Sequence, residues 1–214
     1  MNGIDYIASI LKRENVEWIS CFPSNPIISA CAKVNIRPIA FRHERGAVMA
    51  ADGYSRISMR KKFGVVAVQS QAGAENAMGG IAQAAADNIP ILILLGGNSL
   101  NQISVKPNFS AVQKYQGWVK QVEAIYSPTQ VGAVMRRAFN ALKNGPPGPV
   151  VVEMTTDVCQ QNVPEEYQNY KSPSYSLQVP DTNEIARTIE LWQKARKPVI
   201  WAGGGVLASS GSIT

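Results

Sequence analysis

Cysteine and histidine are scarce in this chain of 214 residues. It contains three cysteines, Cys21, Cys31 and Cys159, and a single histidine, His43. Three widely spaced cysteines form neither a zinc-binding pattern nor an even-numbered disulfide framework, so we expect a reducing, cytoplasmic setting. One histidine excludes histidine-rich metal sites and any mechanism that takes two imidazoles from this chain. We therefore predict no metal ligands within the sequence.

Long apolar runs are absent as well. The longest run covers residues 89–95 and contains a proline, which is typical of a buried strand. A membrane-spanning helix needs about 18 or more apolar residues in succession, and no such stretch occurs. Residues 1–6 show no basic segment followed by an apolar one, so no signal peptide is predicted. We expect no membrane partner.

Positive charge is in excess but is not concentrated. The net charge is +6, from 21 Lys and Arg against 15 Asp and Glu. The basic residues fall in short, separate groups with no interleaved aromatic residues, whereas a nucleic-acid surface usually gathers them on one face. Solvated helix faces are the better interpretation, and we expect no nucleic-acid partner. The groups are residues 12–13, 60–62, 136–137 and 194–197.

Strand-like and helix-like segments alternate along most of the chain. Continuous apolar runs predict strands that are covered on both faces, and the segments between them show helical spacing. This alternation predicts an α/β fold with a doubly wound, mainly parallel six-stranded sheet and helices on both faces. Residues 100–116 are polar and are predicted to be irregular. The predicted strands are 16–22, 36–41, 63–70, 90–95, 118–125 and 149–154, and the predicted helices are 4–14, 27–33, 44–58, 74–87 and 127–143.

Composition divides the chain into three parts. Residues 1–160 hold the alternating pattern and form the first domain. Residues 161–180 are rich in Gln, Tyr, Ser and Pro without periodicity, which indicates a linker. Residues 181–214 then start a second α/β domain, with a capped helix at 181–194, a strand at 198–202 and three successive glycines. We expect this second domain to be truncated.

Glu44 stands where the strand 36–41 passes into a helix of small residues. In open α/β sheets, ligands bind at the carboxyl ends of the strands, so a carboxylate there is a candidate functional group. An acid in the first turn of a helix also suits capping, and position alone favours capping. Two more turns, 22–25 and 69–76, follow neighbouring predicted strands and should converge on the same edge of the sheet.

The ordered set of motifs resembles a known superfamily over essentially the whole chain. Residues 3 to about 160 resemble the pyrimidine-binding domain of thiamine diphosphate enzymes of the acetolactate synthase, pyruvate oxidase and benzoylformate decarboxylase group. Residues 183–205 resemble the start of that family's central domain. The matching segments are Phe22-Pro23-Ser24-Asn25, Arg42-His43-Glu44 with Gly46 and Ala50-Ala51-Asp52-Gly53-Tyr54, Gln71-Ala72-Gly73-Ala74-Glu75-Asn76, and Gly148-Pro149-Val150.

The resemblance implies specific roles. Glu44 would be catalytic, bonding the pyrimidine N1′ of thiamine diphosphate and sharing a proton with it. Pro23 and Gly73 would contact the cofactor, and Asn76 would either contact it or tie the turn beside it. We expect the side chains of Arg42 and Arg45 to point away from Glu44.

The resemblance also implies what the complete enzyme does. The substrate would be a 2-oxo acid, acted on by decarboxylation or by C–C bond formation or cleavage. The enzyme would be a homodimer or homotetramer. The family binds Mg²⁺ and the diphosphate in a C-terminal domain, for which this sequence has no motif, so the chain alone is expected to be inactive.

Some positions depart from the family's pattern. Asn25 and Gln69 fall where benzoylformate decarboxylase has a serine and a histidine that face the substrate, and the alternative is that both only cap turns. Phe109 matches a substrate-facing phenylalanine of acetolactate synthases, but Ser110 replaces the glutamine that follows it there.

The sequence leaves three other interpretations open. A non-catalytic binding or assembly subunit could keep the fold, although it would not need Glu44. A nucleotide-binding oxidoreductase would place Gly-x-Gly-x-x-Gly after an early strand, and this chain does not. The run 203–205 could belong to an FAD or ADP site of the kind that some family members carry, but close packing of a helix on a strand is favoured.

Overall fold

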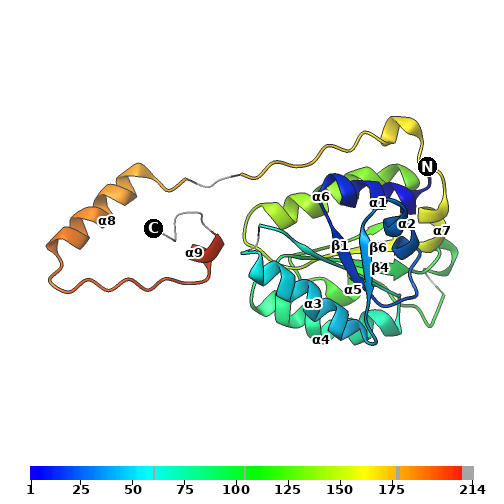
Figure 1. The fold of residues 1–214 in the computed structure, drawn as a ribbon, viewed down its shortest axis with the longest axis horizontal. Coiled ribbons are helices and arrows are strands. Elements are labelled where there is room, and N and C mark those ends of the chain that lie inside the picture. The colour runs from blue at the N-terminus through cyan, green and yellow to red at the C-terminus, as the bar shows by residue number, and fades with distance from the viewer. Residues whose placement is uncertain (60, 104, 177–178, 209–214) are drawn as a thin grey trace. The chain divides into compact units, whose positions relative to one another are not determined.

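The structure is a computed structural model that describes residues 1–59, 61–103, 105–176 and 179–208 (Figure 1). It divides into two compact units, Met1–Ser174 and Tyr175–Thr214, which are described separately. The division falls inside the predicted linker 161–180. Residues 177–178 of that linker and residues 209–214 of the predicted second domain lie outside the described residues, as does Arg60 of one basic group.

The first unit is built on a six-stranded sheet in which every pairing is parallel, so the predicted fold class is confirmed. The strand order is β2-β1-β3-β4-β6-β5. The strands are β1 Trp18–Cys21, β2 Arg37–Ala40, β3 Gly64–Val68, β4 Ile91–Gly97, β5 Gln121–Ile125 and β6 Val150–Thr155. The helices are α1 Gly3–Arg13, α2 Ile27–Lys33, α3 Glu44–Ile57, α4 Ala72–Ala86, α5 Ala111–Tyr115, α6 Val131–Lys143 and α7 Thr156–Gln160, and the 3₁₀ turns are Leu100–Gln102, Pro128–Gln130 and Glu165–Tyr167.

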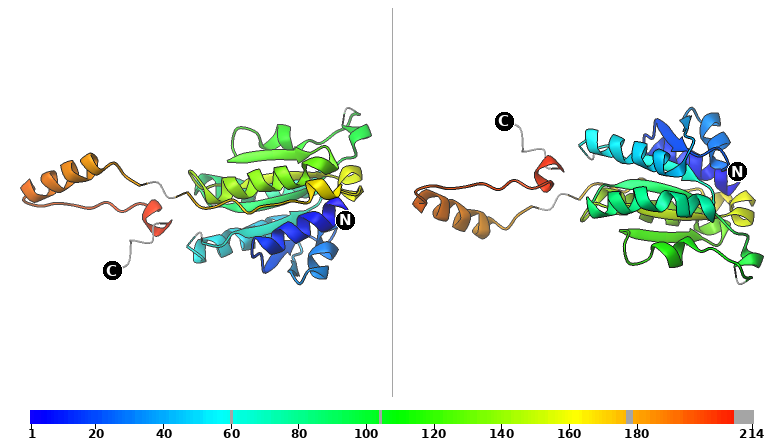
Figure 2. Two further views of the ribbon diagram at one scale, coloured as in Figure 1. Left: turned by 90° about the horizontal axis from the view of Figure 1, so that it is seen from above. Right: turned by 90° about the horizontal axis from the view of Figure 1, so that it is seen from below.

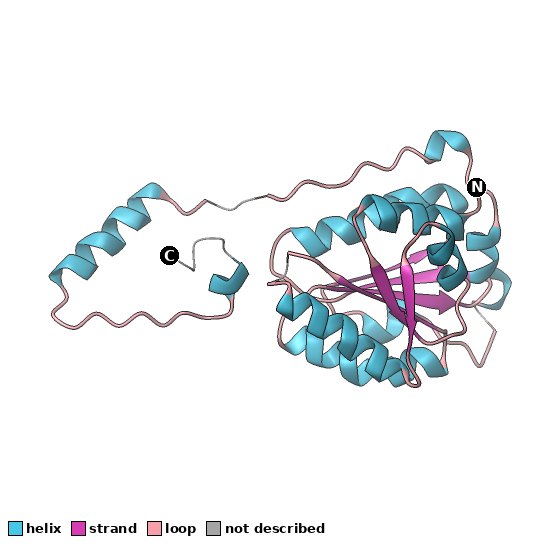
Figure 3. Ribbon diagram, viewed as in Figure 1, coloured by secondary structure: helices cyan, strands magenta, loops and turns pink. Residues whose placement is uncertain are grey.

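The strands lie between two layers of helices (Figures 2 and 3). Successive side chains of β3 point to opposite faces, so Val65 and Ala67 join one apolar cluster while Val66 and Val68 join the other. The first cluster contains residues of α1, α2 and α6, and the second contains residues of α3, α4 and α5. Both faces are therefore covered, which explains the continuous apolar runs of the central strands.

Helix α5 was not predicted. The segment 100–116, predicted to be irregular, contains α5. Its first turn is held by Ser110, whose hydroxyl accepts the Gln113 N–H at 3.4 Å, and by Glu153, whose carboxylate accepts the Ala111 N–H at 3.0 Å. Glu153 lies 42 positions away in the chain. The helix therefore depends on a tertiary contact that no local pattern reveals.

The second unit contains two helices in its described residues, α8 Thr182–Lys194 and α9 Gly205–Ala208. The predicted cap of α8 is present, since Asp181 accepts the N–H groups of Asn183 and Glu184. The strand predicted at 198–202 is wrong for this structure, which assigns no strand there. A strand needs a hydrogen-bonded neighbour, and all strand pairing in the described chain belongs to the sheet of the first unit.

The first half of the predicted linker is anchored on the first unit. The Tyr170 hydroxyl donates to the Glu14 carboxylate, which also pairs with Lys143 at 2.7 Å. The Tyr170 N–H donates to the hydroxyl of Tyr6 at 3.0 Å. These contacts explain why the compact unit extends to Ser174, beyond the boundary at residue 160 that composition suggests.

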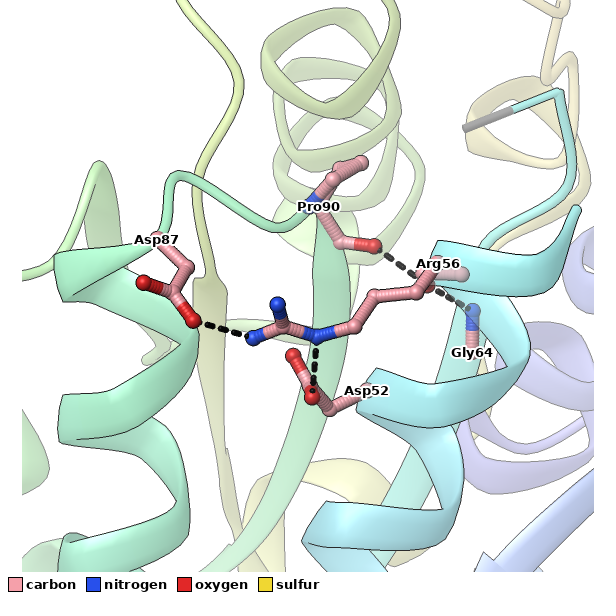
Figure 4. A network of polar contacts seen from close by, with 6 residues as sticks. Asp52, Arg56, Gly64, Asp87 and Pro90 are labelled. Atoms are coloured by element: carbon pink, nitrogen blue, oxygen red, sulfur yellow. Dashed lines mark hydrogen bonds and ion pairs between the residues drawn. The ribbon is translucent and has the colours of Figure 1, made fainter. Parts of the chain in front are cut away.

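A polar network fastens the far end of α3 (Figure 4). Arg56 binds Asp52 through Nε and Asp87 through Nη2, each at 2.7 Å, and so joins α3 to the end of α4. The Ser55 hydroxyl donates to the Pro90 carbonyl at 2.7 Å and accepts the Gly64 N–H at 2.8 Å, which joins α3 to the start of β3. The network fixes the helix whose other end carries Glu44.

Gly64 leaves no room for a side chain at this junction. A Cβ added there would lie 2.0 Å from the Ala51 carbonyl oxygen and 2.5 Å from its Cα. We predict that Gly64→Ala lowers the free energy of unfolding of the first unit by about 3 kcal/mol or more, because two backbones must separate. Urea unfolding monitored by circular dichroism measures this.

The matched control for Gly64 is Gly53→Ala on α3, where an added Cβ meets no atom within 4 Å. It should leave stability unchanged or raise it by about 1 kcal/mol, since alanine favours helix. Equal stability of the two variants would contradict the close approach of Gly64 to Ala51.

Within the described residues, no helix is long and apolar enough to cross a membrane.

Candidate functional site

Three turns meet at the carboxyl edge of the sheet because β2, β1 and β3 are neighbours and all run the same way. Backbone hydrogen bonds tie the turns together, with Phe22 N–H donating to the Ala67 carbonyl at 3.1 Å and Phe41 N–H to the Cys21 carbonyl at 2.8 Å. The convergence that the sequence predicted for these turns is therefore present.

Glu44 is the first residue of α3 and is 3% exposed. The helix is capped by its neighbour His43, whose Nδ1 accepts the Arg45 N–H at 3.1 Å. The capping function that position alone favoured for Glu44 belongs to His43, and the Glu44 carboxylate is directed to α4 instead.

Asn76 holds one oxygen of this carboxylate. Its Nδ2 donates to Oε2 of Glu44 at 3.1 Å, from the second turn of α4. Within the described part of the chain, Oε1 accepts no hydrogen bond, and it would lie 3.3 Å from a Cβ added at Gly73. One oxygen is thus fixed, and the other is available beside a residue that has no side chain.

Gln69 covers the other side of Gly73. A Cβ at Gly73 would lie 2.3 Å from Cγ of Gln69 and 3.3 Å from its Cβ. Gly73 is therefore required for Gln69 and Glu44 to approach each other across the start of α4. The structure brings together four of the predicted site residues: Glu44, Gln69, Gly73 and Asn76.

Gln71 has a backbone conformation that side chains disfavour. Its φ is +54° and its ψ is −111°, which lies outside the left-handed helical region. Such a conformation costs about 1–3 kcal/mol and is often found at functional sites. The Gln71 turn directs the chain into α4, where Gly73 N–H donates to the Ser70 carbonyl at 3.2 Å.

Asn25 uses both ends of its amide within the fold. Its Nδ2 donates to the Val68 carbonyl at 3.0 Å, and its Oδ1 accepts the Ile27 N–H at 3.2 Å. This geometry favours the turn-capping alternative for Asn25 over contact with a substrate. Pro23 is exposed in the same turn. Its cofactor contact stays a prediction.

Phe109 is 8% exposed and belongs to the apolar cluster beneath α4 and α5. Its remaining surface lines a cavity of about 290 Å³ together with Gln71 and Ala72. It therefore lies near the turn that follows β3. Contact between Phe109 and a substrate stays a prediction.

Both arginines beside Glu44 are exposed. A Cβ at Gly79 would lie 2.9 Å from Nη2 of Arg45, which places that guanidinium over α4. Neither Arg42 nor Arg45 forms an ion pair with Glu44 among the described residues. The geometry agrees with the expectation that both turn away from the carboxylate.

A cavity of about 570 Å³ opens between the N-terminal halves of α3 and α4. It is lined by His43, Arg45, Gly46, Met49, Glu75 and Asn76. Asn76 is shared between this cavity and the Glu44 carboxylate. The lining combines apolar surface from Met49 and Gly46 with polar side chains.

The sequence matches one family model and several acetolactate synthases. Residues 1–124 match the family model "Thiamine pyrophosphate enzyme, N-terminal TPP binding domain". The chain is 29% identical to the chloroplastic acetolactate synthase of Arabidopsis thaliana, with 99% of this chain and 33% of that protein aligned. It is 30% identical to the acetolactate synthase large subunit of Haemophilus influenzae, with 98% of this chain and 38% of that subunit aligned.

The chain thus spans about a third of the length of these curated relatives. The family model covers more than half of the chain, and it includes the turns around Glu44, Gly73 and Asn76. The chain belongs to the thiamine pyrophosphate enzyme family, through its N-terminal TPP-binding domain.

Proposed function

We propose that this chain is the N-terminal part of a thiamine diphosphate-dependent enzyme that acts on a 2-oxo acid. The reaction would be decarboxylation or C–C bond formation or cleavage, as in the acetolactate synthases that it resembles. One observation carries the proposal. Glu44 is buried at the edge of the sheet, with Oε2 held by Asn76 and Oε1 available beside Gly73.

The residues fit the pyrimidine ring of the cofactor. Pyrimidine N1′ needs a carboxyl group at hydrogen-bond distance. Glu44 has such a group, and its Oε1 accepts no hydrogen bond from the described chain. Gly73 has no β-carbon to crowd Oε1, and the side chain of Gln69 packs against it. We propose that Glu44, Gly73 and Asn76 hold the ring, with Pro23 at its border.

The proposed roles of the chain's own groups are binding, orientation and proton sharing. When bound, thiamine diphosphate supplies the electron-accepting thiazolium ring needed for bond changes next to a carbonyl. Glu44 would hold a proton at pyrimidine N1′ through Oε1. Asn76 would fix the orientation of the carboxylate, and Gln69 would face the substrate side of the site.

The diphosphate and Mg²⁺ need other residues. Within the described chain, no group of three or more His, Cys, Asp or Glu residues is placed to hold a metal ion. We propose that a C-terminal domain outside these residues binds the diphosphate and Mg²⁺, and that the enzyme is a cytoplasmic homodimer or homotetramer. Residues 1–214 alone would then be inactive.

Calorimetry with thiamine diphosphate and Mg²⁺ tests whether the diphosphate site lies outside residues 1–214. The complete enzyme, meaning this chain together with the part that binds the diphosphate, should bind the cofactor. Residues 1–214 alone should bind it at least about a hundredfold more weakly, a difference of about 2.7 kcal/mol. Micromolar binding by residues 1–214 would contradict the proposal that the diphosphate site lies elsewhere.

A further inference from the structure

Glu153 is a buried acid at the carboxyl end of β6. It is 6% exposed and is separated in sequence from the turns described above. Burial raises the pKa of its carboxyl group, while hydrogen bonds from the N–H groups of Ala111 and Val112 oppose that rise. A buried carboxyl group needs partners of this kind, because a charge without them is costly.

Gly97 provides the space for Glu153. A Cβ added at Gly97 would lie 2.9 Å from Cγ of Glu153, and one added at Gly96 would lie 3.3 Å from the Ser70 nitrogen. The glycine pair that ends β4 therefore has Glu153 on one side and the turn after β3 on the other. Glu153 thus lies close to the edge of the sheet where Glu44 and Gly73 meet.

The Glu153 carboxylate holds the first turn of α5. Its Oε2 accepts the Ala111 N–H at 3.0 Å, and the carboxylate also accepts from Val112. With 5 residues, α5 is too short to be stable by itself, so this attachment fixes its position.

The other end of α5 is attached to α4. The Tyr115 side chain is fully buried, and its hydroxyl donates to the Ala74 carbonyl at 2.6 Å. Ala74 directly follows Gly73 in the first turn of α4. Lys114 and Glu75 also pair at 3.2 Å, but both are about half exposed, and such pairs contribute little.

We propose that Glu153 is a positioning residue for the site around Glu44. Its carboxylate fixes α5, and Tyr115 transmits that position to the N-terminal end of α4, where Gly73 and Asn76 face Glu44. Glu153 itself touches neither Glu44 nor the proposed ligand cavity. The expected change in cofactor affinity rests on the proposed function, whereas the expected change in amide exchange does not.

Amide hydrogen exchange of the complete enzyme, measured by mass spectrometry without cofactor, tests the proposal. Glu153→Gln keeps the shape but removes the charge that two N–H groups share. Exchange should become about tenfold faster in residues 111–115 and in residues 72–77, since charge-assisted hydrogen bonds are the stronger ones. The dissociation constant for thiamine diphosphate should rise by a similar factor.

Two further variants make the result specific. Tyr115→Phe removes only the hydroxyl that reaches Ala74, so it should speed exchange in residues 72–77 by a similar factor, and adding Glu153→Gln should have little further effect there. Glu123→Gln on the adjacent strand β5 is the matched control. Glu123 pairs with Arg137 and, within the described chain, forms no hydrogen bond or ion pair with α5, so exchange at 72–77 should stay unchanged.

The exchange rates in residues 111–115 and 72–77 decide whether Glu153 positions the site. Faster exchange in residues 111–115 with unchanged exchange in residues 72–77 would overturn the proposal. If Glu153→Gln unfolds the domain, Tyr115→Phe decides, since unchanged exchange at 72–77 in that variant overturns it too. If the wild-type enzyme binds no thiamine diphosphate, the proposed function is wrong. The exchange test of Glu153 does not depend on that result.

Discussion

Replacing Glu44 with Gln in the complete enzyme is expected to lower cofactor-dependent turnover by about 10²–10⁴-fold. The amide has nearly the same shape, and its oxygen can still accept the hydrogen bond that Asn76 donates to Oε2 at 3.1 Å. It carries no acidic proton to share with pyrimidine N1′. Turnover of a 2-oxo acid at saturating thiamine diphosphate measures the loss, and circular dichroism checks that the fold is kept.

The control for this substitution is Glu17→Gln. Glu17 is an exposed acid whose partner, Lys62, lies at 2.6 Å. Pairs of this kind contribute little to stability, so the variant should keep full activity. Unchanged turnover in Glu44→Gln would contradict the catalytic role and would favour the alternative of a non-catalytic subunit that keeps the fold.

The second large effect is expected at Gly73. In Gly73→Ala, the added Cβ would lie 2.3 Å from Cγ of Gln69 and 3.3 Å from Oε1 of Glu44. Gln69 must move, and the methyl group occupies space beside the oxygen that is proposed to meet the ring. We expect the dissociation constant for thiamine diphosphate to rise at least about tenfold, which corresponds to about 1.4 kcal/mol. Calorimetry on the complete enzyme measures it.

Gly53→Ala separates this effect from the general effect of alanine in a helix. It lies on the neighbouring helix α3, and an added Cβ there meets no atom within 4 Å. Its cofactor affinity should equal that of the wild type. If Gly73→Ala also bound the cofactor normally, Gly73 would not form a wall of the ligand site.

Much of the fold could be predicted because its signals are local. The apolar runs of β3 and β4 are buried on both faces, so continuous apolar sequence was sufficient to predict covered parallel strands. Glu44 could be placed at the ligand edge because a strand end and a helix start adjoin it in sequence. The strand order then brought the turns after β1 and β3 beside it.

The remaining features depend on contacts between distant residues. The bond from Asn76 to Glu44 spans 32 positions, and the bond from Ala111 to Glu153 spans 42, so no local pattern distinguishes them. Asn25 matched a substrate-facing position in sequence, yet its amide is engaged by the Val68 carbonyl, 43 positions away. Helix α5 was missed for the same reason.

A crystal structure of the complete enzyme with thiamine diphosphate and Mg²⁺ tests whether Glu44 meets the pyrimidine ring. We expect Oε1 of Glu44 to lie about 2.7–3.2 Å from pyrimidine N1′, with Asn76 still bonded to Oε2 and the ring against Gly73. A pyrimidine ring bound elsewhere, or one whose N1′ meets no atom of Glu44, would contradict this expectation.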